Sequence, residues 1–173
     1  MAPEVDILIN NAGSLVKRAG LTEFSEELFN EVMDLNFRSA WCISQDVVPS
    51  MESKGWGVIV NLSSIAARNG GGPGATIYAA AKAAVACATK GMAKELAPKG
   101  IRVNSILPGW TRSSLTEGLQ TWDKFNDQVI SRAPVGRWAN GDDFSAIAVY
   151  LASDHSSFHV GDSIVIDGGY TVF

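Results

Sequence analysis

Long apolar runs, excess positive charge and paired cysteines are all scarce in this sequence of 173 residues. No apolar stretch approaches the roughly 20 residues that a bilayer-spanning helix requires, and the opening MAPEVD lacks the pattern of a signal peptide. The formal net charge is −4, so we expect no basic stripe of the kind that neutralises nucleic-acid phosphates. These absences predict a cytoplasmic protein that binds neither membranes nor nucleic acid.

The two cysteines, Cys42 and Cys87, form no CxxC pair and lie in stretches with helical periodicity. They predict reduced side chains in a core, because neither a disulfide framework nor a metal site is built from two isolated cysteines. Hydrophobic residues make up 46% of the chain, which is enough to build one hydrophobic core. We therefore expect residues 1–173 to form a single domain.

Short apolar segments alternate with helical patterns along the chain. Buried strands are predicted at 5–10 (VDILIN), 57–63 (GVIVNLS), 101–107 (IRVNSIL) and 162–167 (DSIVID). Helices are predicted from Ser25 to a stop at Pro49 and Gly55, from Ile77 to Leu96, and from Asp142 to Ala152. Apolar strands that alternate with helices predict an α/β fold with a parallel sheet and right-handed crossovers.

The segment 76–86, TIYAAAKAAVA, places one phenol and one ammonium in a run of small apolar residues. Tyr78 and Lys82 are four residues apart, so a helix presents them on the same face. A nearby ammonium favours the phenolate and should lower the pKa of the tyrosine, which suits acid–base chemistry on a hydroxyl or a carbonyl. A solvated pair of exposed side chains is the plain alternative.

Three predicted strands end in small or polar residues: NNAG at 10–13, NLSS at 61–64 and PG at 108–109. The carboxyl ends of parallel strands form one edge of a sheet, where α/β proteins bind ligands. In their order along the chain, these motifs, together with LNF around Asn36, YAAAK and VIDGG, resemble the short-chain dehydrogenase/reductase family over residues 5–170. The resemblance implies a doubly wound, Rossmann-like parallel sheet and hydride transfer between NAD or NADP and an alcohol or ketone.

The resemblance also assigns roles to individual residues. It implies that Tyr78 is the acid/base, that Lys82 assists Tyr78 and holds the cofactor ribose, that Ser64 binds the substrate oxygen, and that Asn36 holds a water linked to Lys82. The residues implied to line the cofactor are Asn10, Ala12, Gly13, Tyr78, Lys82, Pro108, Gly109 and Thr111. Thr111 and Ser113 depart mildly from the residues usual in the family. The family also implies a homo-oligomer, a dimer or a tetramer.

Family members normally begin with a strand and a T-G-x-x-x-G-x-G turn that binds the cofactor pyrophosphate at a helix N-terminus. This sequence holds no such turn, so we expect it to correspond to the carboxyl-terminal two thirds of the domain, without the first strand–helix units and with one edge of strand 5–10 unpaired. The stretch 70–75, GGGPGA, matches the spacing formally but does not directly follow a strand, and Pro73 lacks an amide donor. NAD and NADP therefore cannot be told apart from the sequence.

Three other features have both a functional and a structural interpretation. His155 and His159 have a metal-ligand spacing but lie in a predicted loop, so we expect surface histidines and no metal. Asp142 and Asp143 are expected to cap a helix. The aromatic stretch 110–125 is either a lid over the substrate or packing against the sheet or another subunit.

Two hypotheses for the function follow. The first is an NAD(P)-dependent oxidoreductase acting on a secondary alcohol or ketone, such as a sugar, a polyol, a 3-oxoacyl group or a cyclic ketone. The second is a non-catalytic, truncated relative that serves only as an oligomerising module. The residues of the expected catalytic set favour the first hypothesis, and the missing glycine turn favours the second.

Overall fold

A parallel sheet forms the centre of the computed structural model, which describes residues 4–172. Its strands over the described residues are β1 (Ile7–Asn10), β2 (Gly57–Leu62), β3 (Ile101–Pro108) and β4 (Ser163–Ile166), in the order β1-β2-β3-β4. Every neighbouring pair is parallel, with Ile7 beside Val58 and Gly57 beside Ile101. The predicted α/β fold with a Rossmann-like parallel sheet is confirmed, and the strands begin and end within two residues of the predicted bounds.

Helices connect each strand to the next. They are α1 (Glu26–Met33), a π-helical turn η1 (Asp34–Arg38), α2 (Ser39–Lys54), α3 (Ala66–Asn69), α4 (Thr76–Leu96), α5 (Glu117–Gln120), α6 (Asp123–Arg132) and α7 (Ser145–Ala152). Short 3₁₀ turns are η2 (Ala97–Lys99), η3 (Ser114–Thr116), η4 (Gly141–Phe144) and η5 (Asp154–Ser156). Among residues 4–172, no helix is both long and apolar enough to cross a bilayer.

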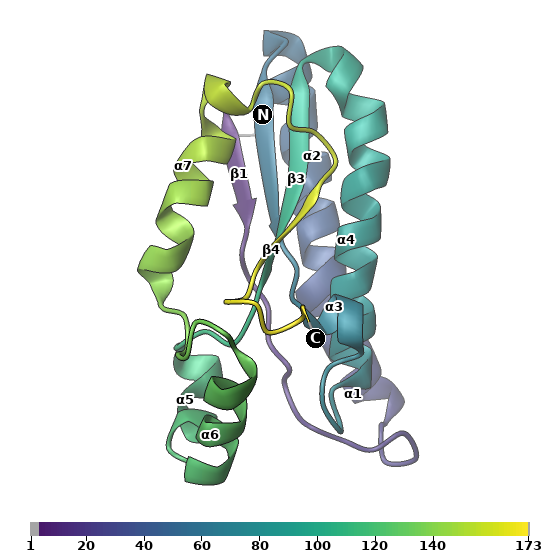
Figure 1. Cartoon of the computed structure of the whole chain (residues 1–173). Coiled ribbons are helices and arrows are strands. Elements are labelled where there is room, and N and C mark those ends of the chain that lie inside the picture. The colour runs from purple at the N-terminus through teal and green to yellow at the C-terminus, as the bar shows by residue number, and fades with distance from the viewer. Residues whose placement is uncertain (1–3, 173) are drawn as a thin grey trace.

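Two apolar clusters bind the helices to opposite faces of the sheet. Figure 1 shows α2 and α4 on one face and α7 on the other. On the first face Met51 and Leu96 pack with Ile59 and Val103, and on the second Leu151 packs with side chains of β2 and β3. The two central strands are therefore buried on both sides, which is why they read as nearly continuous apolar runs.

The segment predicted as one helix from Ser25 is α1, η1 and α2 in succession. Ser25 caps α1 as expected, since its hydroxyl accepts a hydrogen bond from the amide of Leu28 at 3.2 Å. The prediction that Pro49 ends the helix was wrong: Pro49 lies inside α2, and Gly55 ends it in the left-handed region with φ 66°. A proline removes one amide donor from a helix, and here packing against the sheet keeps the helix intact.

Two predictions about burial were also wrong. Cys42 and Cys87 are free thiols, but both are exposed, because they lie on the outer sides of α2 and α4. Strand β1 was expected to be buried on both faces, yet Ile7 and Ile9 are 40% and 52% exposed. Only Leu8 of β1 packs against the cluster on the α2 face. The side chains that alternate with Leu8 point to the opposite face, which α7 does not cover as far as β1.

Candidate active site

The expected site residues gather where the strands end. Because the four strands are parallel, Asn10, Leu62 and Pro108 end at the same edge of the sheet. In Figure 1 this edge lies at the lower end of the sheet, next to α3 and the first turn of α4. Ser63 and Ser64 follow β2 directly there. Their backbone continues the pairing, with the Ser63 amide donating to the carbonyl of Ile106 at 2.8 Å.

Tyr78 and Lys82 lie on one face of α4, as predicted. The Lys82 ammonium is 5.8 Å from the centroid of the Tyr78 ring, and it donates to the carbonyl of Leu62 at 2.9 Å. The Ser63 hydroxyl in turn donates to the carbonyl of Lys82 at 2.7 Å, so β2 and α4 are joined at this point. Burial lowers the pKa of Lys82 to about 8, and the side chain is still mostly protonated at pH 7.

The direction of the Tyr78 pKa differs from the prediction. Burial raises the pKa of Tyr78 above its ordinary value of 10.0, and a hydrogen bond with Ser64 opposes that effect. The attraction of a nearby ammonium for the phenolate is only one of the effects on this pKa. Desolvation disfavours the charged form of any buried acid, and burial is the larger effect here.

Asn36 is held by the π-helical turn η1, a feature that the sequence analysis did not predict. Its amide donates to the carbonyls of Val32 at 2.8 Å and Ser14 at 2.7 Å, and its oxygen accepts from the Ser14 amide at 3.1 Å. The side chain is 1% exposed. Asn36 therefore anchors the segment that follows β1, and single π-type turns of this kind are frequent at functional sites.

The residues after β1 approach the Lys82 side chain closely. A Cβ atom on Gly13 would lie 2.7 Å from the Lys82 ammonium and 2.8 Å from Asn36 Oδ1, so any larger residue there would displace one of these two side chains. Ala12 and Gly13 are exposed along this edge. Asn10 is different: its side chain is buried and donates to Ser44 at 3.1 Å and to Asn61 at 2.8 Å, which makes it part of the interior.

The residues after β3 form the other side of the edge. The Gly109 amide donates to the carbonyl of Ile166 at 2.9 Å, and the Thr111 hydroxyl donates to the carbonyl of Gly109 at 3.0 Å. A Cβ on Gly109 would lie 2.6 Å from Asp167, so β3 and β4 leave no room for a side chain. Ser113 caps η3, and its amide donates to Thr116 Oγ1 at 3.1 Å.

The aromatic stretch after β3 contains both packed and exposed rings. Trp110 makes edge-to-face contacts with Phe125, Trp138 and Tyr170, at centroid distances of 5.1, 5.7 and 6.3 Å. Trp122 stacks on Phe125 but is 56% exposed. The packing interpretation therefore holds for Trp110, which ties α6 to the end of β4. The lid interpretation stays a prediction for the exposed part of the stretch.

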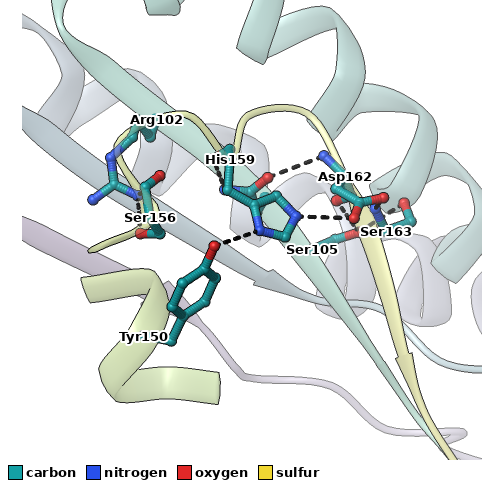
Figure 2. A network of polar contacts seen from close by, with 8 residues as sticks. Arg102, Ser105, Tyr150, Ser156, His159, Asp162 and Ser163 are labelled. Atoms are coloured by element: carbon teal, nitrogen blue, oxygen red, sulfur yellow. Dashed lines mark hydrogen bonds and ion pairs between the residues drawn. The ribbon is translucent and has the colours of Figure 1, made fainter. Parts of the chain in front are cut away.

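His155 and His159 lie near the opposite end of the sheet, before β4. Figure 2 shows the ring of His159 between the Tyr150 hydroxyl at 3.3 Å and the Asp162 carboxylate at 2.9 Å. Residues 4–172 contain no group of three or more His, Cys, Asp or Glu side chains that could hold a metal. His159 thus joins α7 to the loop that precedes β4.

Asp143 lies in η4, at the start of a helical segment, as the sequence indicated. Its carboxylate accepts from the amide of Asn140 at 2.8 Å, and the capping residue itself is Asn140. The same carboxylate forms a two-point ion pair with the guanidinium of Arg137, at 2.7 and 2.8 Å. This pairing holds the pKa of Asp143 well below its usual range. Asp142 contributes its backbone amide to the cap.

Comparisons with known proteins match nearly the whole chain. A family model described as enoyl-(acyl carrier protein) reductase matches residues 2–171. The 3-oxoacyl-(acyl-carrier-protein) reductase of Thermotoga maritima is 40% identical over 168 residues, which cover 97% of this chain and 67% of that protein. The gluconate 5-dehydrogenase of Gluconobacter oxydans is 38% identical over 168 residues, covering 97% of this chain and 65% of that protein.

A solved structure extends the match to three dimensions. The gluconate 5-dehydrogenase of Burkholderia cenocepacia, in complex with NADP and tartrate, superimposes with a TM-score of 0.94 at 35% identity, over 98% of this chain and 66% of that one. The chain thus spans about two thirds of the length of the relatives that it matches. These matches, together with the sheet topology and the residues at its carboxyl edge, show that the chain belongs to the short-chain dehydrogenase/reductase family.

Proposed function

We propose that this protein is an NAD(P)-dependent oxidoreductase that interconverts a secondary alcohol and a ketone. The observation that carries the proposal is the meeting of Ser64, Tyr78 and Lys82 at the carboxyl edge of the sheet. Relatives over nearly the whole chain are named as oxidoreductases of sugar acids and of 3-oxoacyl groups. We propose further that residues 1–173 form one domain, equivalent to the carboxyl-terminal two thirds of the domain in these relatives.

The residues at the edge fit the nicotinamide half of the cofactor. The close approach at Gly13 leaves the backbone free of side chains beside the Lys82 ammonium, and an ammonium has three protons to donate. We assign cofactor contacts to the residues beside this ammonium and after β3, namely Asn10 through its backbone, Ala12, Gly13, Tyr78, Lys82, Pro108, Gly109 and Thr111. When bound, the cofactor supplies or accepts the hydride. The proposed cofactor is NAD or NADP.

Each catalytic side chain has a separate task. The Tyr78 phenol gives a proton to the ketone oxygen, or takes one from the alcohol, and the Ser64 hydroxyl holds the same oxygen by a hydrogen bond. Lys82 holds its positive charge near the phenol, which favours the phenolate when the proton leaves. Asn36 acts as a positioning residue, since both of its amide protons and its oxygen take part in hydrogen bonds that tie Ser14, after β1, to the end of α1.

We favour a sugar acid as the substrate class, because two of the relatives are named gluconate 5-dehydrogenases, and one of them binds tartrate. A 3-oxoacyl thioester is the second candidate, on the name of the Thermotoga maritima relative. We further propose a cytoplasmic homo-oligomer, a dimer or a tetramer. The exposed apolar side chains of α2, Trp41 at 40% and Ile43 at 44%, support an association through that helix.

The test is turnover of a keto-gluconate and of a 3-oxoacyl thioester with NADH and NADPH. Tyr78→Phe should lower kcat by about 10²- to 10⁴-fold, the range of general acid catalysis, and leave the Kd of the cofactor within a few-fold. Lys82→Ala should damage both quantities. Tyr150→Phe is the matched control, because Tyr150 contacts His159 at the other end of the sheet. A Tyr78→Phe enzyme with more than a tenth of the original kcat would contradict the assignment, and a protein inactive with every substrate would favour the oligomerising module.

A further inference from the structure

Residues 14–19, which we name the strap, lie against the loop 70–75. The guanidinium of Arg18 donates to the carbonyl of Pro73 at 2.7 Å, and the amide of Ala19 donates to the carbonyl of Gly74 at 3.3 Å. A Cβ on Gly74 would lie 3.1 Å from both the Ala19 nitrogen and the Arg18 Cβ, and φ of Gly74 is +75°. The glycines of this loop thus permit close contact with the strap.

The other end of the strap is fixed to Asn36 and lies beside Lys82. Ser14 forms two hydrogen bonds with the side chain of Asn36, through its amide at 3.1 Å and its carbonyl at 2.7 Å. Gly13, directly before the strap, approaches the Lys82 ammonium so closely that a side chain would collide with it. One short segment therefore contacts the surroundings of Lys82 at its start and the loop before Tyr78 at its end.

The middle of the strap is strained. Val16 has φ +61°, a region that β-branched residues almost never occupy. The turn is tight: the Lys17 amide donates to the carbonyl of Leu15 at 2.8 Å, and the Val16 amide donates to Ser14 Oγ at 3.0 Å. Strain of this kind persists only where the surroundings hold the chain on both sides. Asn36 holds one side of Val16, and Arg18 with Ala19 holds the other.

The loop leads directly into the helix that carries the phenol. Ala75 precedes α4 and offers no side-chain cap, and its amide donates to the carbonyl of Gly72 at 3.0 Å. Tyr78 is in the first turn of α4, so the position of the loop determines where the phenol lies relative to Ser64. Helix ends without a side-chain cap fray more readily than capped ones, which makes an outside support effective here.

We propose that Arg18 is a positioning residue that latches the strap to the loop 70–75 and thereby holds the first turn of α4, with Tyr78, against Ser64. The catalytic meaning of this latch rests on the proposed function, whereas the latch itself does not. Lys17 is the matched control, because it is a neighbouring exposed cation whose described contact is made by its backbone amide.

Hydrogen exchange on the full chain tests the latch without any turnover. In Arg18→Ala, the amides of Ala19, Ala75 and Ala79 should exchange about five- to tenfold faster, as expected for the loss of one hydrogen bond that is exposed to solvent. Amides in the middle of α4, such as that of Lys90, should not change. Arg18→Lys keeps one donor for Pro73 and should restore most of the protection, and Lys17→Ala should match the original chain. Equal exchange in Arg18→Ala and Lys17→Ala would overturn the latch.

A second readout follows the phenol itself. Nitration of tyrosine with tetranitromethane requires an accessible phenolate, and peptide mapping separates Tyr78 from Tyr150 and Tyr170. Arg18→Ala should nitrate Tyr78 several-fold faster and leave the other two tyrosines unchanged. An unchanged Tyr78 rate would overturn the positioning role even if the loop exchanges faster.

The kinetic readout separates this inference from the proposed function. With a turned-over substrate, Arg18→Ala should lower kcat at least tenfold more than it raises the Kd of the cofactor, and Arg18→Lys should recover most of kcat. Equal effects on both quantities would contradict a role through Tyr78. If the protein turns over no substrate, the proposed function fails, while exchange and nitration still decide whether Arg18 positions the phenol.

Discussion

Arg102 offers a sharp test of what holds α7 to the sheet. The side chain leaves β3 and is 9% exposed. Its guanidinium donates to the carbonyls of Leu151, Ser153 and Ser156, each at 3.1 Å, and also to the Ser156 hydroxyl. Figure 2 shows the guanidinium next to Ser156. These carbonyls lie at the end of α7 and in the turn that follows it, where those of Ser153 and Ser156 also accept the backbone amides of Ser156 and His159, at 3.2 and 2.9 Å.

The free energy at stake follows from these contacts. A hydrogen bond from a charged donor contributes about 1.5–3 kcal/mol net. The single proton of the Ser156 hydroxyl can go to the carbonyl of Leu151 at 3.1 Å, and backbone amides still reach the carbonyls of Ser153 and Ser156, so each carbonyl keeps one donor within reach when Arg102 is removed. Arg102→Met retains the apolar stem. We therefore expect it to lower the free energy of unfolding by about 2–4 kcal/mol, equivalent to one or two charged hydrogen bonds.

Urea denaturation followed by circular dichroism measures this loss. With an m-value of about 2 kcal/mol/M, the midpoint should fall by about 1–2 M. Arg112→Met is the control: Arg112 is exposed and its contact with Gln120 is long, 3.4 Å, so its effect should stay within about 0.5 kcal/mol. A loss below about 1 kcal/mol for Arg102→Met would show that the carbonyls at the end of α7 do not depend on the guanidinium.

Two further predictions concern stability. Gly100→Ala should destabilise the protein by more than about 3 kcal/mol, roughly the size of a severe backbone clash, because φ of Gly100 is +81° and a Cβ there would lie 2.0 Å from the carbonyl oxygen of Gly55. Gly91→Ala is the control, since Gly91 lies in open space on α4, and it should stabilise the protein by about 0.5–1 kcal/mol in thermal melts. Equal effects of the two substitutions would refute the clash. The hydrogen bond from His159 lowers the pKa of Asp162 below its ordinary 3.8, so this carboxylate contributes stability above pH 3.8 that is lost as the pH falls through its folded pKa. Asp162→Asn should therefore flatten the acid limb of stability against pH, and an unchanged limb in urea titrations would contradict it.

The sheet was predictable because its strands are buried on both faces. β2 and β3 carry apolar residues in direct succession, so hydrophobicity alone marks them, and glycine or proline marks their ends. The outer helix faces were harder to predict, since apolar residues also occur there. Phe29 of α1 is 43% exposed, whereas Val32, three positions on, is fully buried. Apolar residues at helical spacing predict a helix, but which of its faces is buried depends on elements that are distant in sequence.

The site was only partly predictable. The spacing of Tyr78 and Lys82 requires nothing beyond helix geometry, so the sequence identified the pair. The glycines at 70–75 match the spacing of a phosphate-binding turn formally. That spacing does not predict their close contact with Arg18 and Ala19. No local pattern marks Arg18 as a contact of Pro73, because 55 residues separate them in sequence. Every residue has a backbone carbonyl, so the composition of the loop does not predict which carbonyl accepts a hydrogen bond from a distant side chain.

Burial changes the pKa values of Tyr78 and Lys82 in opposite directions and thereby determines the protonation states of both side chains in the free protein. It raises the pKa of Tyr78 and lowers that of Lys82 to about 8, since each charged form loses solvation. At neutral pH the phenol is therefore protonated, and the neighbouring side chain is mostly an ammonium. A protonated phenol beside an ammonium is ready to donate a proton. Under the proposed function, we therefore expect these residues to be prepared for the reduction of a ketone, while oxidation of an alcohol would require the phenol to lose its proton first and should be favoured by alkaline pH.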